Sequence, residues 1–386
     1  MFGPDSQVLL LLLVIASVSA LVATVRLRLF AVKFACGTLS IVVAMTAGIV
    51  AVNSFYGYYT SWGQVWADFH GATGNLGAIS TASSQAAGAG RLGWVNLPGR
   101  LSGYDRRALV YLPPQYGEAG YAQVRFPVVE LFHGSPGAPV GWQTLLHISQ
   151  VADHLIDSRQ IGPMILVMPS INGPGHDYQD CVNAPGLNDE TYLLRDVRND
   201  ILALYRASPD PYEWAAAGYS SGGFCAANMA LRNRTSFGAA AVINGYYRAA
   251  DGPAAAALGN NLPLEIENSP LYLAEQVTLD SGPLPAFWVA AGANDKPDYR
   301  PATVFAAALD RYEPVPFARL NAGDTANAWE AALPVALTWL WQQLAPPDLR
   351  VLFPVRSSTQ TSGTLPVPPV KHHPVADQHT RAAVPA

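Results

Sequence analysis

Two long apolar runs near the N-terminus dominate the pattern of apolar and polar positions. They cover residues 8–25 and 34–52, and each is close to the ~20 residues that a helix needs to cross the hydrocarbon core of a membrane. Arg26, Arg28 and Lys33 lie between the runs, so the positive-inside rule places this short loop in the cytoplasm. We therefore expect an integral protein of the cell membrane, with two spans and with everything after them on the extracytoplasmic side. A cleaved signal peptide is the alternative interpretation of the first run.

From residue 92 onwards, short apolar runs alternate with segments of helical periodicity. The runs lack the polar–apolar alternation of a half-exposed strand, which is typical of strands buried on both faces of a parallel sheet. Strands are expected at 108–112, 128–132, 164–168, 214–217, 239–243, 286–291 and 317–320. Helices are expected at 148–156, 191–206, 224–231 and 329–344. This order predicts an α/β domain whose mostly parallel sheet is covered by helices on both faces.

The composition divides the chain into four parts. Residues 1–54 form the membrane anchor, and residues 55–91 form a juxtamembrane segment and a linker rich in Gly, Ala, Ser and Thr. The α/β domain covers residues 92–347, which is long enough to bury a substantial core. The tail, 348–386, is rich in Pro and poor in large apolar residues, so we expect it to be disordered.

Charge and cysteine content narrow the function classes. Charged residues make up 13% of the 386 residues, the net charge is −5 and no basic stripe exists, so we expect no nucleic-acid partner. We expect no cofactor and no metal, because His372, His373 and His379 lie in the tail without a scaffold. Cys181 and Cys225 fall in the part predicted to be extracytoplasmic, where disulfides persist. A bridge between them and a pair of free buried thiols both remain open.

The stretch from Gly218 to Gly222 carries the strongest chemical signal. It reads Gly-Tyr-Ser-Ser-Gly between a predicted strand and a predicted helix, which is the context of a nucleophile elbow. The turn is so tight that side chains near the serine must be absent, and glycines lie two residues before and two residues after Ser220. The hydroxyl would project over the N-terminus of the next helix, where anionic charge is favoured. Ser220 is therefore the candidate nucleophile, and an ordinary strand-to-helix turn is the alternative.

Ester chemistry also needs an oxyanion hole and an acid that orients the base. The amide of Ser221 and that of Ser135, in the loop after the strand at 128–132, are the candidate oxyanion donors. The acid should follow the strand at 286–291, where Asp295 is the first candidate and Asp298 the second. An Asx turn ahead of a helix is the alternative role for Asp295.

The base is missing where it is expected. The loop after the strand at 317–320 contains Asp324 but no histidine, and no histidine occurs between His176 and His372. An aspartate is too weak a base at neutral pH unless its pKa is strongly raised. Asp324 itself, or His176 brought in from the loop before Cys181, are the two candidates for the base.

Several motifs carry a family resemblance. They occur in order as Leu97-Pro98-Gly99, Ser102-Gly103-Tyr104, Val110 to Pro114, His133 to Gly137 with Gly141-Trp142, Asn172-Gly173 before Cys181, Gly218 to Gly223, and Trp329 with Leu333-Pro334. The domain resembles the esterase D / mycolyltransferase-type branch of the α/β-hydrolases, in particular its membrane-anchored esterases. The resemblance implies an α/β-hydrolase fold, a serine nucleophile at Ser220, an acid near Asp295 and acyl esters as substrates. Members usually carry a Gly-His-x-x-x-x-Trp segment after the last strand. Here the segment from Gly323 to Trp329 aligns with it and puts Asp324 in the histidine position.

Two functions follow from these patterns. The first is a membrane-anchored, extracytoplasmic serine esterase or acyltransferase that acts on acyl-ester or lipid substrates through Ser220. The second is a catalytically impaired hydrolase-fold protein that binds a lipid or glycan, or scaffolds cell-envelope enzymes. Loss of the histidine favours the second function, whereas retention of the elbow, the Ser135 loop and Asp295 favours the first.

Overall fold

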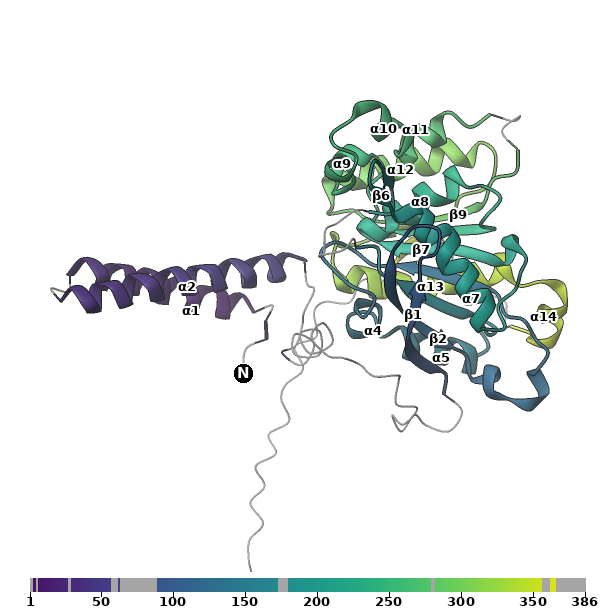
Figure 1. Cartoon of the computed structure of the whole chain (residues 1–386), viewed down its shortest axis with the longest axis horizontal. Coiled ribbons are helices and arrows are strands. Elements are labelled where there is room, and N and C mark those ends of the chain that lie inside the picture. Colours follow the sequence, from purple (N-terminus) through teal and green to yellow (C-terminus); the bar gives the residue numbers. More distant parts are fainter. Residues whose placement is uncertain are drawn as a thin grey trace, which may run out of the picture.

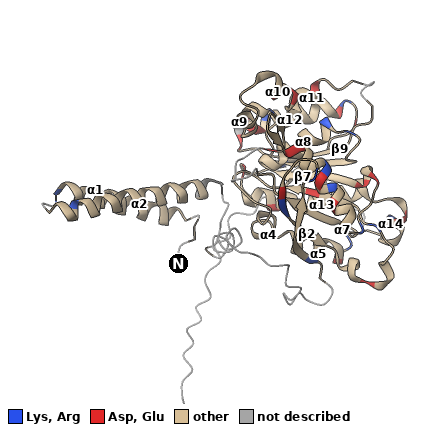
Figure 2. Ribbon diagram, viewed as in Figure 1, with Lys and Arg blue, Asp and Glu red and all other residues tan. Residues whose placement is uncertain are grey.

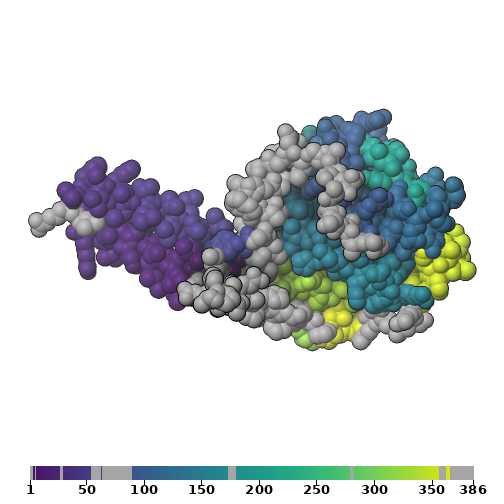
Figure 3. All heavy atoms as spheres, turned by 90° about the horizontal axis from the view of Figure 1, so that it is seen from below, coloured from purple at the N-terminus to yellow at the C-terminus, as the bar shows by residue number. Residues whose placement is uncertain are grey.

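The computed structural model describes residues 3–4, 6–26, 29–56, 62, 89–172, 180–278, 282–355 and 362–365. Two long helices, α1 (Gln7–Arg26) and α2 (Phe30–Tyr56), come first. They pack side by side, with the hydroxyls of Ser17 and Ser40 3.3 Å apart across the pair (Figure 3). The charged residues of the described parts of these two helices, Arg26 and Lys33, lie at the end of the pair where α1 leads into α2 (Figure 2). Both helices are long and apolar enough to cross a membrane, and both predicted runs fall inside them.

A nine-stranded sheet forms the centre of the rest of the chain (Figure 1). Its strands, in spatial order, are β1 (Arg91–Pro98), β2 (Asp105–Leu112), β4 (Ile165–Pro169), β3 (Val128–Phe132), β7 (Trp214–Tyr219), β8 (Ala239–Ile243), β9 (Ala286–Gly292), β10 (Phe317–Leu320) and β11 (Gly363–Leu365). The first two strands are antiparallel to their neighbours and all the others are parallel. The strands β5 (Asn183–Ala184) and β6 (Leu187–Asn188) form a separate hairpin.

Helices cover both faces of the sheet. One face carries α7 (Arg198–Leu204), α8 (Ser221–Arg232), α11 (Pro270–Glu275) and α12 (Lys296–Asp310), and the other carries α4 (Gly141–Thr144), α5 (Ile148–Asp157) and α13 (Ala326–Leu344). The remaining helices are α6 (Asp189–Thr191), a π-helix at Tyr192–Val197, α9 (Ala254–Ala257), α10 (Leu262–Glu267), α14 (Pro347–Leu352), and 3-10 turns at Pro114–Gly117, Ala119–Tyr121, Pro211–Glu213 and Ala249–Asp251.

Each central strand is buried along its whole length because it contributes to two cores. In β3, Val128 and Phe132 belong to the core on the α8 side, whereas Val129 and Leu131 belong to the core on the α13 side. All five residues of the strand are buried. This explains why the strands read as continuous apolar runs, and it confirms the predicted fold class.

Some boundaries differ from the prediction. The edge strand β1 was not among the predicted strands, because its side chains are only partly buried and the run is interrupted by polar residues. The helix predicted at 191–206 is a π-helix that continues into α7 and ends at Leu204, and α13 begins at Ala326 instead of Trp329. The prediction of a disordered tail over 348–386 is wrong for α14 and β11. Leu349 and Leu365 in these elements are buried against the domain, while 356–361 and 366–386 lie outside the described residues.

The parallel strands bring five loops to one edge of the sheet. The carboxyl ends of β3, β7, β8, β9 and β10 meet there, and open α/β sheets bind their ligands outside these ends. Ser135, Ser220, Asn244, Asp295 and Asp324 lie in the loops that follow these five strands.

Candidate active site

Ser220 lies at the sharp turn between β7 and α8. Its backbone has φ 52° and ψ −124°, a conformation that non-glycine residues rarely adopt and that is concentrated at functional sites. A side chain at Gly218 would collide with the backbone of Gly222, and a side chain at Gly222 would collide with the backbone carbonyl of Phe132. The amide of Ser220 donates to the carbonyl of Ile243 at 3.0 Å. The predicted strand–turn–helix context of Ser220 is therefore present.

The two predicted oxyanion donors belong to segments that flank the nucleophile. Ser221 is the first residue of α8 and is buried. Gly134 packs against the elbow, because a Cβ added there would lie 3.3 Å from the Cβ of Ser220. Ser135 follows Gly134 and is half-buried. The loop after β3 thus lies next to Ser220, as the sequence predicts.

His133 has a structural role in this loop. The amide of Ile171 donates to its Nε2 at 3.3 Å, so the proton of the neutral ring is on Nδ1, which donates to the carbonyl of Gly134 at 2.8 Å. Burial lowers the pKa of His133 to about 4. A neutral imidazole with both nitrogens engaged does not serve as the base.

Asp324 is the side chain that meets Ser220. Its carboxylate accepts a hydrogen bond from Nε1 of Trp329 at 2.6 Å. Burial raises the pKa of Asp324 to about 7; the nearby hydroxyl of Ser220 and the bond from Trp329 oppose this rise, and the charges of Asp295 and Asp298 add to it. The carboxyl therefore ionises near neutral pH, which an aspartate in water does not.

Trp329, which donates a hydrogen bond to Asp324, is part of a cluster of aromatic rings. Trp329 stacks on Tyr219, with ring centroids 4.3 Å apart and an angle of 25° between the planes. Trp142 also packs against Tyr219 in a T-shaped contact, with centroids 4.9 Å apart. All three rings are almost fully buried. The sequence indicates Trp329 only as part of a motif, and its bond to Asp324 was not predicted. Its position one helical turn after the loop was the available signal.

A second contact fixes the backbone beside Asp324. Asn244, in the left-handed region at φ 47°, donates from Nδ2 to the carbonyl of Gly323 at 2.8 Å. Asn244 follows β8, so this bond ties the loop after β8 to the loop after β10. Asn244 was not among the predicted site residues, because a single Asn after a strand has no distinguishing pattern.

Asp295 and Asp298 lie at the start of α12, after β9. Both are half-buried. Burial raises the pKa of Asp295, and burial together with the charges of Asp295 and Asp251 raises the pKa of Asp298 to about 7. The two expected acids are thus close enough to influence Asp324, but their neighbour is a carboxyl and not an imidazole. His176, the other candidate base, lies outside the described residues, as do His372, His373 and His379.

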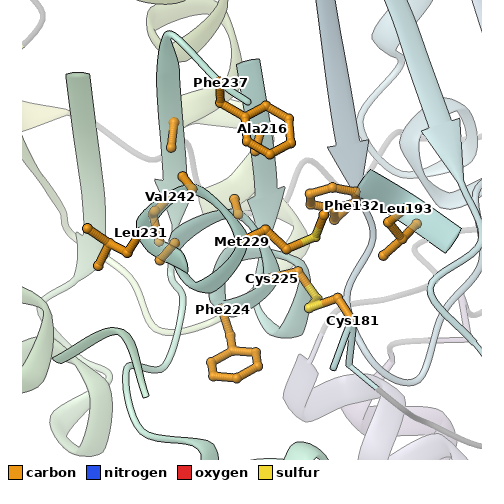
Figure 4. Packing of buried hydrophobic residues seen from close by; sticks show 14 of the residues in the cluster. Phe132, Cys181, Leu193, Ala216, Phe224, Cys225, Met229, Leu231, Phe237 and Val242 are labelled. Atoms are coloured by element: carbon orange, nitrogen blue, oxygen red, sulfur yellow. A yellow bond between two sulfur atoms is a disulfide. The ribbon is translucent and has the colours of Figure 1, made fainter. Parts of the chain in front are cut away.

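Cys181 and Cys225 form a disulfide with a Cα–Cα distance of 5.7 Å (Figure 4). The bridge joins the segment after β4 to the second turn of α8, and the alternative of two free thiols is excluded. Cys36 in α2 is a free thiol. In the part of the chain that the structure describes, no group of three His, Cys, Asp or Glu side chains could hold a metal ion.

Known proteins resemble this chain in sequence and in fold. The Esterase family model ("Putative esterase") matches residues 100–342. An uncharacterized protein of Corynebacterium glutamicum is 31% identical over 141 residues, which are 36% of this chain and 32% of that protein. The chain therefore spans about a third of the length of this curated relative.

Solved structures of esterases share the fold. A ferulic acid esterase superposes with a TM-score of 0.59 at 23% identity, over 67% of this chain and 99% of that one. An S-formylglutathione hydrolase of Agrobacterium tumefaciens has a TM-score of 0.57 at 17% identity, over 69% and 99% of the two chains. The serine hydrolase FphF of Staphylococcus aureus has a TM-score of 0.55 at 20% identity, over 66% and 99%.

Proposed function

The chain belongs to the Esterase family, and we propose that it is a membrane-tethered serine esterase or acyltransferase that cleaves acyl esters through Ser220, with Asp324 as the base. The observation that carries the proposal is the position of the Asp324 carboxyl beside Ser220, in a buried environment that raises its pKa to about 7. A general base is most efficient when its pKa lies near the working pH. Asp324 meets this condition without an imidazole.

The first half of the reaction forms an acyl-enzyme. The Oγ of Ser220 attacks the ester carbonyl while its proton passes to the carboxylate of Asp324. The amides of Ser221 and Ser135 donate to the oxyanion of the tetrahedral intermediate, where preorganised donors stabilise the developing charge. The intermediate collapses when Asp324 returns the proton to the leaving alcohol.

The second half releases the acyl group. Water, or the hydroxyl of an acceptor, attacks the acyl-enzyme and gives its proton to Asp324, and Ser220 leaves with that proton. Attack by water completes hydrolysis, and attack by an acceptor hydroxyl completes acyl transfer. Burial raises the pKa of Asp324, and the charges of Asp295 and Asp298 add to this rise, so in this proposal the two expected acids help to tune the base.

The tethering part of the proposal rests on α1 and α2. Their length and apolar surface suit two spans, with residues 1–54 as the anchor, 55–91 as the linker and the hydrolase domain from residue 92. The basic residues between the helices favour a cytoplasmic turn, which puts the domain on the extracytoplasmic side. The disulfide supports this side, because such bridges persist in oxidising compartments.

A second candidate is a catalytically impaired hydrolase-fold protein that binds lipid or glycan, and the absence of a histidine from residues 321–328, where the family motif usually has one, favours it. One assay separates the two. The full chain, solubilised in a mild detergent, is given short-chain p-nitrophenyl esters beside Ser220→Ala. Release of p-nitrophenol that depends on Ser220 supports the esterase, and equal rates in both proteins refute it.

A further inference from the structure

Two adjacent residues after β4 hold two adjacent residues of α8. Cys181 is bonded to Cys225 (Figure 4). The carboxylate of Asp180 accepts a hydrogen bond from the hydroxyl of Tyr246. The ring of Tyr246 stacks on Phe224, with centroids 4.5 Å apart and an angle of 10° between the planes. The segment Asp180–Cys181 is therefore attached to α8 at two neighbouring positions. The disulfide holds Cys225, and the hydrogen bond to Tyr246 holds the ring that stacks on Phe224.

Tyr246 is the centre of this arrangement. The hydroxyl of Ser221, the residue directly after the nucleophile, is close enough to lower the pKa of Tyr246, which burial raises. The ring of Tyr246 leaves no room for a side chain at Gly252, because a Cβ there would collide with it. Asp180 is 1% exposed, and its carboxylate accepts the hydrogen bond from Tyr246. A buried carboxylate is tolerated where such donors satisfy it.

The backbone of Asp180 and Cys181 has an unusual conformation. Asp180 and Cys181 both have left-handed backbones, with φ of 45° and 57°. Non-glycine residues in this region persist only when the surrounding structure holds them there, and such residues cluster at functional sites. The conformation turns the side chain of Asp180 toward Tyr246 and that of Cys181 toward Cys225.

We propose that Tyr246 is a positioning residue. Held by Asp180, it fixes the first turn of α8, so that the hydroxyl of Ser220 and the amide of Ser221 keep the geometry that the tetrahedral intermediate requires. The inference rests on the proposed serine chemistry, and it adds residues that touch neither substrate nor base. A displacement of about 1 Å in a catalytic group can cost on the order of 100-fold in rate.

The test compares three variants of the full chain in detergent. Tyr246→Phe removes the hydroxyl and keeps the ring on Phe224. Asp180→Asn weakens the acceptor and keeps a residue type that tolerates the left-handed region. Tyr247→Phe is the matched control, because Tyr247 is the next residue, is also buried and has a hydroxyl with no hydrogen-bond partner among the described residues.

We expect kcat to fall by roughly 10- to 100-fold in Tyr246→Phe and in Asp180→Asn, with KM within about twofold of the parent because ground-state binding does not use this geometry. A boronic acid, which mimics the tetrahedral intermediate, should bind more weakly by the same factor. The double variant should be no worse than either single one. Unchanged kcat, a loss confined to KM, or an equal loss in Tyr247→Phe would overturn the proposal.

Hydrogen exchange separates this proposal from the proposed function. The amides of residues 219–225 should exchange faster in Tyr246→Phe and Asp180→Asn than in the parent and in Tyr247→Phe. If the parent shows no Ser220-dependent turnover, the proposed function fails, and the exchange result still decides whether Tyr246 holds the helix. Exchange that is the same in all four proteins refutes the positioning role.

Discussion

The loop after β7 and the loop after β10 supply the two halves of the proposed reaction, but they are held in different ways. The β7 loop is fixed by its backbone: glycines at 218 and 222 allow contacts that no side chain permits, and a disulfide secures the helix beyond. The β10 loop is fixed by side chains, through Trp329 and Asn244. The position of the nucleophile therefore depends on the path of the backbone, whereas the base depends on the identity and surroundings of one residue, Asp324. A family can change the second without disturbing the first.

The largest effect is expected where the base is removed. Asp324→Asn keeps the size of the side chain but cannot accept the proton of Ser220. General base catalysis contributes about 10²–10⁴-fold, so Ser220-dependent ester hydrolysis should fall by that factor, while the melting temperature falls by no more than a few degrees. A rate within threefold of the parent would show that another group is the base.

Asp324→His asks how competent the present base is. With an imidazole in place of the carboxyl, we expect a gain of less than about tenfold if Asp324 already works as the base, since both groups then ionise near neutral pH. A gain above about 100-fold in the steady-state rate would instead support the catalytically impaired protein.

A substitution that disrupts the backbone contacts of the β7 loop should lower the stability of the protein before it affects the chemistry. Gly222→Ala forces a Cβ into the backbone carbonyl of Phe132, and strain of this kind costs several kcal/mol. Thermal unfolding should show a loss of about 2–4 kcal/mol together with a loss of activity. Gly323→Ala is the matched control in the β10 loop, because a Cβ there meets no atom within 4 Å, and its unfolding should match the parent's. Equal losses in the two variants would contradict the difference between the loops.

The sequence predicted the backbone-held half better than the side-chain-held half. The glycines around Ser220 are a local signal, and the buried strands are visible in the sequence as apolar runs. The positions of the elbow and of the central strands could therefore be predicted. The bond from Trp329 to Asp324 depends on how α13 packs against Tyr219, which no local pattern records. The hydrogen bond between Asp180 and Tyr246 joins residues that are 66 positions apart in the sequence, so no local pattern predicts it. The helix at 347–352 and the strand at 363–365 were missed because a few apolar residues suffice to form them: Leu349 packs into an existing core, and β11 pairs with the existing strand β10.

The smallest effect is expected from the hydrogen bond of the tryptophan. Trp329→Phe keeps most of the stack on Tyr219 and removes the donor to Asp324. Because that bond favours the charged carboxylate, its loss should raise the pKa of Asp324 further, and the acid limb of the pH–rate profile should move up by on the order of one unit. Activity at alkaline pH should recover toward that of the parent. A uniform loss at every pH would mean that Trp329 acts through packing alone.

The most direct test of the central claim is the pH dependence of kcat/KM for Ser220-dependent ester hydrolysis by the full chain. The base must be ionised to accept a proton, and the pKa of Asp324 is about 7, so kcat/KM should rise with pH and reach half its maximum near pH 7. In Asp324→Asn the residual rate should lose this limb. A limb near pH 7 that persists in Asp324→Asn, or a profile that is flat between about pH 5 and 8 in the parent, would contradict the assignment of Asp324 as the base.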